Sequence, residues 1–174
     1  MSASACATES SGHESSRHRT SRSLISGLEL LRQFTPEQPE RGISELALAM
    51  GVSRPTAHRY AATCLELGYL EQVRTRRYRL TRRAAEPGMT TLDDRRYSRA
   101  LHSGLAILAC FTPERALLGS TEIAQLLGMS VATTRRFVVT LAEVGYLERD
   151  PSSKYRLSLQ AIDLGIAGWP GVEE

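Results

Sequence analysis

Two pairs of residues with the chemistry to bind an anion or a base recur along this chain. Thr56 and Arg59 lie three positions apart, so on a helix their side chains share a face. The same pair returns as Thr133 and Arg136, an offset of 77 residues (133 − 56). A threonine hydroxyl can bond a phosphate or a base edge, and an arginine guanidinium can bond guanine or phosphate through two N–H groups. The pairs therefore indicate nucleic-acid contacts, although an arginine on an arbitrary helix is more often solvated.

The same offset holds over most of the chain, which indicates a duplicated unit. Ser26-Gly27-Leu28 returns as Ser103-Gly104-Leu105, and Gly68-Tyr69-Leu70-Glu71 returns as Gly145-Tyr146-Leu147-Glu148, without any gap. Solenoid repeats have periods of roughly 20–50 residues, so a unit of this length is a small domain. The chain has 174 residues, of which 41% are hydrophobic and 24% charged. This size and composition suit two small globular domains.

Each unit carries the pattern of helix, short helix, glycine turn, capped helix and hairpin. In the first unit, helical spacing predicts a helix that ends before Pro36 and a short second helix capped by Ser44. Ser53 is the expected cap of the third helix, and Ser130 takes its place in the second unit. Two short strands are expected at 69–73 and 77–81. The predicted fold is mainly α with small β-hairpin wings, in two tandem winged helix-turn-helix domains.

The expected limits of the two domains are 21–87 and 99–168. Residues 1–20 are rich in serine and lack an apolar core, so they are expected to form a disordered tail. Residues 88–98 follow Pro87 and are expected to be a linker or the start of a connecting helix, and 169–174 a second tail. No apolar run approaches the roughly 18 residues that a membrane span needs. We expect a cytoplasmic, nucleoid-associated protein.

The other reactive side chains form no pattern typical of catalysis or metal binding. Cys6, Cys64 and Cys110 are scattered, and the last two lie in apolar helical patterns, which favours buried thiols. The four histidines show no ligand spacing with them. No Ser/His/Asp group or glycine-rich phosphate loop is visible in the sequence. We therefore expect no enzymatic activity, no cofactor and no metal.

Several motifs, taken together, match a known pattern in both units. In the first unit they are Thr56-Ala57-His58-Arg59, Leu67-Gly68-Tyr69-Leu70-Glu71 and Tyr78-Arg79-Leu80, and in the second Gly128-Met129-Ser130 and Glu143 through Glu148. They resemble the DNA-binding domain of the isocitrate lyase regulator (IclR) family. In that family one such domain is normally followed by a larger effector-binding domain, and the protein dimerises. Here a second DNA-binding unit takes that place, so the resemblance implies DNA binding but not small-molecule sensing.

The third helix and the wing of each unit supply the candidate DNA-binding residues. In the first unit these are Ser53, Arg54, Thr56, His58, Arg59, Thr63, Arg74, Arg76, Arg77 and Arg79. In the second unit they are Ser130, Thr133, Arg135, Arg136, Thr140, Ser153, Lys154 and Arg156. The tyrosines Tyr78 and Tyr155, and also Ala57 and Thr134, are expected to pack in the core instead.

Charge and residue identity differ between the units. The net charge is +6 over 53–83 and +2 over 130–160, so the first unit is expected to bind DNA more strongly and with a steeper salt dependence. Differences at Arg54/Val131, Pro55/Ala132 and His58/Arg135 predict two unlike half-sites in a non-palindromic element. These half-sites should lie roughly 34–36 Å apart, one turn of DNA.

The predicted function is sequence-specific binding of double-stranded DNA by a transcriptional regulator. Its expected partners are promoter or operator DNA and, as a protein, RNA polymerase or another regulator. The chain is expected to act as a monomeric pseudo-dimer or as a homodimer. The alternative is a tandem winged-helix scaffold that binds protein without specific DNA readout. The paired Thr/Arg faces and the basic first wing argue against that alternative.

Overall fold

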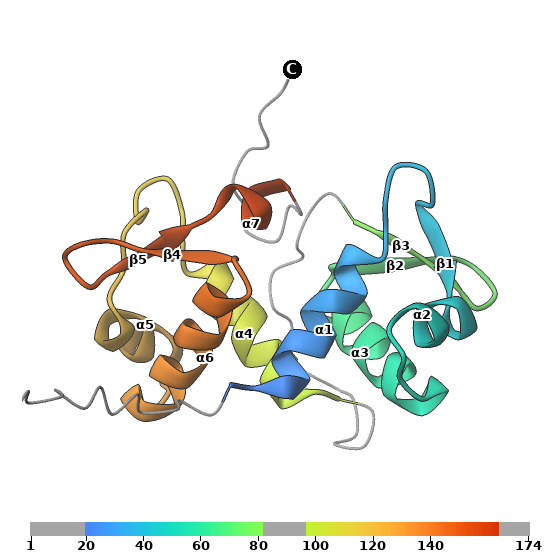
Figure 1. The fold of residues 1–174 in the computed structure, drawn as a ribbon, viewed down its shortest axis with the longest axis horizontal. Coiled ribbons are helices and arrows are strands. Elements are labelled where there is room, and N and C mark those ends of the chain that lie inside the picture. The colour runs from blue at the N-terminus through green and yellow to red at the C-terminus, as the bar shows by residue number, and fades with distance from the viewer. Residues whose placement is uncertain (1–19, 82–96, 164–174) are drawn as a thin grey trace, which may run out of the picture.

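The computed structural model describes residues 20–81 and 97–163. We call these ranges the first and the second unit. The expectations for the N-terminal tail, for most of the linker and for the end of the chain lie outside the described residues. Figure 1 shows the two units on either side of a central pair of helices, with a small sheet at each flank.

Both units contain three helices followed by a hairpin; in the described ranges the first adds a short strand and the second adds a short helix. The first consists of α1 (Arg22–Arg32), β1 (Glu40–Gly42), α2 (Ile43–Ala49), α3 (Arg54–Glu66), β2 (Leu70–Arg74) and β3 (Arg77–Leu80). The second consists of α4 (Arg99–Ala109), α5 (Ser120–Leu127), α6 (Val131–Glu143), β4 (Leu147–Arg149), β5 (Tyr155–Leu157) and α7 (Leu159–Asp163). The structure is mostly helical with small antiparallel sheets, and this confirms the predicted fold class. Within these two ranges, none of the helices has the length and apolar character to cross a membrane.

The start of the second helix differs from the prediction. The cap of α2 is Gly42 in an extended conformation, and Ser44 lies inside the helix. The carboxylate of Glu45 accepts a hydrogen bond from the Gly42 N–H at 2.9 Å, and this bond lowers the pKa of Glu45. In α5 the carboxylate of Glu122 accepts from the Gly119 N–H at 2.6 Å in the same way. A glutamate at the third helical position therefore decides where each helix begins.

The first wing contains a strand that the sequence pattern did not predict. β1 pairs with β3 in antiparallel register, Glu40 opposite Arg79 and Gly42 opposite Arg77, so the strand order is β1-β3-β2. In the second unit the corresponding contact is reduced to one bridge between Leu118 and Tyr155. The segment before the second helix therefore pairs with the hairpin over three residues in the first unit and through one bridge in the second.

The turn before each third helix depends on glycine. Gly51 and Gly128 have φ of +63° and +62°, the left-handed region that other residues rarely adopt. The next element then begins at a serine cap: Ser53 Oγ accepts from Thr56 N at 3.3 Å, and Ser130 Oγ accepts from Thr133 N at 3.2 Å. These local signals set the start of α3 and of α6 where the sequence predicts them.

The two units share one hydrophobic core, which passes through α1 and α4. Leu24 of α1 lies where a side chain on Gly104 of α4 would be, and Leu101 of α4 lies where a side chain on Gly27 of α1 would be. Both leucines are fully buried. Each contact has its counterpart at the 77-residue offset, which is the self-complementary pattern of a two-fold interface. Separating the units would expose this apolar surface to water, so the stability of each unit depends on its contact with the other.

Candidate nucleic-acid interface

The first turn of each third helix presents a hydrogen-bonded pair of hydroxyls. Ser53 Oγ and Thr56 Oγ1 are 2.8 Å apart, and Ser130 Oγ donates to Thr133 Oγ1 at 2.8 Å. Because Ser130 is the donor, the hydroxyl proton of Thr133 is available for an outside acceptor. The unpaired N–H groups at the start of a helix favour an anion at the same place. These two turns are therefore suited to bind DNA phosphate or a base edge.

Arg59 and Arg136 lie one turn further along their helices. The guanidinium of Arg59 is 5.4 Å from the centroid of the Tyr60 ring, and that of Arg136 is 5.1 Å from the centroid of Phe137. Arg136 is exposed, whereas Arg59 is half-buried and its Nε has no hydrogen-bond partner in the described structure. Among residues 20–81 and 97–163 neither arginine forms an ion pair. The ring contacts orient both side chains while the charges stay uncompensated.

Two threonines of the predicted set do not lie on the exposed face. Thr63 and Thr140 have no exposed surface, and their hydroxyls donate to the carbonyls of Arg59 and Arg136 at 2.9 and 2.8 Å. Both are covered by the other unit, so their assignment to the DNA-binding set is wrong. The basic side chains Arg54, His58 and Arg135, in contrast, are exposed around the start of the helices. Ala57 and Thr134 are fully buried, as predicted.

Most cations of the wings are paired with acids of the same unit. Arg79 Nε donates to Glu71 at 2.8 Å and Arg156 Nε donates to Glu148 at 2.9 Å, in each case across the hairpin. Arg77 lies 3.2 Å from Glu45. Lys154 makes the matching contact with Glu122 at 3.2 Å. Two of these ion pairs lie within a hairpin and two join a wing to the second helix of its unit, so these four cations carry less free positive charge than Arg74 and Arg76.

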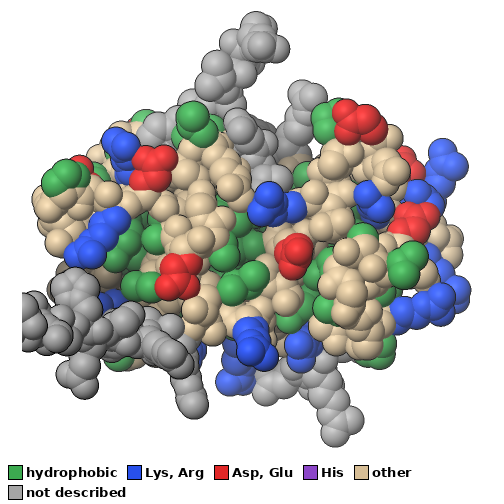
Figure 2. Space-filling view, in the orientation of Figure 1, with side chains coloured by type: hydrophobic (Ala, Val, Ile, Leu, Met, Phe, Trp, Pro, Cys, Tyr) green, Lys and Arg blue, Asp and Glu red, His purple; other side chains and the backbone are tan. Residues whose placement is uncertain are grey.

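The tip of the first wing keeps its positive charge free. Arg74 and Arg76 are exposed, and neither has an acidic partner within the described part of the chain. Figure 2 shows basic side chains gathered at the right-hand edge, over the β2–β3 hairpin. The equivalent positions in the second wing are Pro151 and Ser153. The second wing instead places Arg149 beside Ser153 at 3.1 Å, a cation that the predicted set of DNA-binding residues did not include.

These contacts predict different salt effects for neighbouring wing arginines. In the variant Arg74→Ala/Arg76→Ala, the slope of log Kd against log salt should become shallower by about 0.9 for each phosphate that is no longer neutralised. Arg77→Ala should leave the slope nearly unchanged and lower Tm, because it breaks the ion pair with Glu45. Fluorescence anisotropy of a labelled duplex between roughly 50 and 200 mM NaCl measures the slopes. Equal changes of slope in both variants would contradict the assignment.

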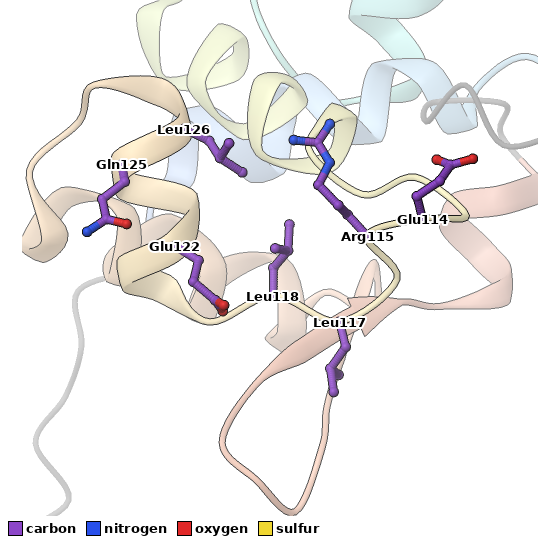
Figure 3. Close-up of a pocket in the computed structure, with 7 residues that line it drawn as sticks. All are labelled: Glu114, Arg115, Leu117, Leu118, Glu122, Gln125 and Leu126. Atoms are coloured by element: carbon purple, nitrogen blue, oxygen red, sulfur yellow. The ribbon is translucent and has the colours of Figure 1, made fainter.

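A shallow pocket in the second unit lies apart from this set of residues. It is lined by Glu114, Arg115, Leu117, Leu118, Glu122, Gln125 and Leu126 (Figure 3). Its Glu122 is already engaged by Gly119 and Lys154, so the pocket has no free carboxylate pair for acid–base chemistry. Cys64 and Cys110 are buried free thiols, as predicted, and burial raises the pKa of both. Cys6 lies outside the described residues.

Fold and site together define a class of protein. Each unit has a glycine turn, a capped third helix with exposed cations, and a hairpin wing, and the two units are fastened together through α1 and α4. This is a tandem winged helix-turn-helix protein. A family model described as the IclR helix-turn-helix domain matches residues 23–74 and again 100–151, which is more than half of the chain. The chain belongs to the IclR helix-turn-helix family, as its motifs indicated.

Two relatives match this chain over about two fifths of its length. The HTH-type transcriptional regulator TsaQ1/TsaQ2 of Comamonas testosteroni is 39% identical over 69 residues, which cover 39% of this chain and 24% of that protein. The crystal structure of an IclR family transcriptional regulator from Brucella abortus is 41% identical, covers 41% of this chain and 28% of that chain, and has a TM-score of 0.40. The chain therefore spans about a quarter of the length of the curated relative.

Proposed function

We propose that this protein is a transcriptional regulator that binds double-stranded DNA sequence-specifically through α3 and α6. The observation that carries the proposal is the repeated arrangement of a capped Ser/Thr turn and an uncompensated arginine on the third helix of a helix-turn-helix. Such a helix places its first turns in the major groove, where hydroxyls and guanidinium groups contact phosphates and base edges. Membership of the IclR helix-turn-helix family supports it. The proposal assigns the chain no catalytic activity.

The two helices should recognise different sequences. At equivalent positions the exposed side chains are Arg54 and Val131, and His58 and Arg135. Arginine and histidine differ in charge and in hydrogen-bond geometry, so they favour different bases. The target is then an element with two unlike half-sites, about one turn of DNA apart.

One chain should suffice to occupy such an element. The α1–α4 contact is self-complementary and is already closed between the two units of one polypeptide. A second copy is therefore not needed to bring two third helices together. In this proposal the protein acts as a monomeric pseudo-dimer, in the cytoplasm and on the nucleoid, and RNA polymerase or another regulator is its protein partner at the promoter.

Selection from a randomised duplex library tests the function. We expect an enriched motif with two unlike halves, and a mobility shift with that motif that survives a large excess of bulk DNA, because specific sites bind about 10³-fold or more tightly than random DNA. A shift that bulk DNA abolishes at equal concentration, or no shift, would favour a protein-binding scaffold instead. A perfect palindrome would indicate a homodimer that uses one unit from each chain.

A further inference from the structure

Each third helix is hydrogen-bonded to the other unit through one buried threonine. Thr63 of α3 accepts from the backbone N–H of Ser98 at 2.9 Å, and Thr140 of α6 accepts from the backbone N–H of Ser21 at 3.2 Å. Ser98 and Ser21 are the residues before α4 and α1. The two bonds are equivalent under the 77-residue offset, and each crosses from one unit to the other.

We infer that Thr63 and Thr140 are positioning residues that fix the separation of α3 and α6, and through it the half-site spacing that one chain accepts. The inference rests on the proposed function for its DNA consequence, but the separation of the helices can be measured without DNA. Neither threonine touches DNA in this proposal. Each acts through the helix on which it lies.

The geometry links these hydroxyls directly to the arginines proposed to contact DNA. Thr63 donates to the carbonyl oxygen of Arg59, and Thr140 donates to that of Arg136. Each hydroxyl therefore joins the backbone of an arginine to the beginning of a helix in the other unit. Movement of one unit against the other has to break these bonds or carry the arginines with it.

The two buried hydrogen bonds add direction to an interface that is mainly apolar, and at its exposed edge Thr20 Oγ1 also donates to Glu143 at 3.0 Å. The leucine–glycine contacts of α1 and α4 hold the units together, but dispersion contacts depend weakly on angle. A hydrogen bond weakens steeply when its angle falls. Thr63 and Thr140 are fully buried, so loss of either hydroxyl leaves a backbone N–H without its acceptor. These two bonds are shielded from water, unlike the exposed Thr20–Glu143 contact, and are thus expected to resist rotation of one unit against the other.

A fixed separation limits the DNA that can be bound. One additional base pair between half-sites moves the second half-site by about 3.4 Å and turns it by roughly a tenth of a revolution. Two helices held at a fixed separation cannot adjust to both the shift and the rotation of a half-site, so one spacing between half-sites should be strongly preferred. A looser pair should accept neighbouring spacings.

Thr134 provides a matched control. It lies on the same helix as Thr140 and is equally buried, but its hydroxyl has no hydrogen-bond partner in the described structure. Thr134→Val therefore removes a buried hydroxyl from α6 without removing either hydrogen bond between the units. Thr63→Ser/Thr140→Ser keeps both hydroxyls and serves as the rescue variant.

The first measurement is the distance between spin labels on full-length protein without DNA. Leu48→Cys on α2 and Gln125→Cys on α5 are exposed and equivalent under the offset. Cys6 is replaced by serine in this background, and Cys64 and Cys110 are buried. We expect one narrow distance distribution for the parent and for Thr134→Val, and a broader one for Thr63→Val/Thr140→Val. An unchanged distribution in the double valine variant would overturn the inference.

The second measurement is selection of the same proteins on the randomised duplex library, scored by the spacing between enriched half-sites. The preference of the wild type for its best spacing over spacings one base pair longer or shorter should fall by about fivefold for each hydroxyl removed, the effect of one ordinary hydrogen bond. The serine variant should keep the wild-type preference. If the double variant folds incompletely, Thr63→Val and Thr140→Val are compared singly.

The outcomes separate the two proposals. A wild type that enriches one spacing, together with valine variants that enrich the same spacing as strongly, would refute the positioning role while the regulator remains. A wild type that enriches no motif, together with a distance distribution that broadens in the valine variants, would refute the DNA-binding function while the positioning role remains.

Discussion

Replacement of Gly104 by alanine should destabilise the protein by about 1–3 kcal/mol, the usual effect of an extra methyl group in a packed core. The added Cβ would lie 2.1 Å from Leu24 Cδ1 and 3.1 Å from its Cγ. Leu24 is fully buried between the units, so its side chain has no solvent-facing position to adopt. Either α1 and α4 move apart or the leucine leaves its rotamer. The change in the free energy of unfolding is measured by urea titration, with circular dichroism as the signal.

A double-mutant cycle provides the control for this prediction. Leu24→Ala alone should be costly, because it opens a cavity in the core. In the Gly104→Ala background the same change should cost less, since it removes the side chain that the new methyl group meets. Leu101→Ala should cost about the same in both backgrounds, because Leu101 faces Gly27. If Leu24→Ala and Leu101→Ala both became less destabilising by the same amount in the Gly104→Ala background, the pairing of Leu24 with Gly104 and of Leu101 with Gly27 would be contradicted.

Loss of either third-helix arginine should weaken binding to the selected element by about 1–3 kcal/mol. Arg59→Ala should relax base preference at one position of one half-site, and Arg136→Ala at one position of the other. The reason is that both guanidinium groups are held over an aromatic ring and lack an ion pair in residues 20–81 and 97–163. Competition with duplexes that are varied at each position measures both affinity and preference.

Arg115→Ala is the matched control, because Arg115 is exposed and lies outside both third helices and both wings. It should bind the element like the wild type. If Arg59→Ala weakens binding equally for every sequence, this arginine contacts phosphate and not a base. If both third-helix variants bind like the wild type, α3 and α6 are not the recognition helices.

Elements with strong local signals were predictable from sequence. The caps Ser53 and Ser130, the inward positions of Ala57 and Thr134, and the buried tyrosines Tyr78 and Tyr155 all follow from spacing within a few residues. The strand β1 was not predictable in this way. It has three residues and no alternating pattern, and it forms because β3 presents a free edge to it. Its existence depends on a partner distant in sequence.

The site shows the same division between local and distant causes. Thr56, Arg59 and Thr63 share a face by helical spacing, so a single helix gives no reason to separate them. The other unit covers the end of that face at Thr63 and leaves its beginning open. Strand alternation likewise predicts the side of the hairpin to which the Arg79 side chain points, but it does not predict the acidic partner. Glu71 lies opposite Arg79 only because of the hairpin register.

For the regulator proposed above, closure of the α1–α4 contact within one polypeptide should change how the occupancy of its DNA target depends on protein concentration. A regulator that must first pair with a second copy occupies its target with a steep dependence on concentration. Here the second unit is tethered beside the first at a high effective concentration, so occupancy should rise in simple proportion to the number of chains at low coverage. In the proposed monomeric mode, a substitution in one third helix should also alter one half of the target alone. In a symmetric pair it would alter both halves at once.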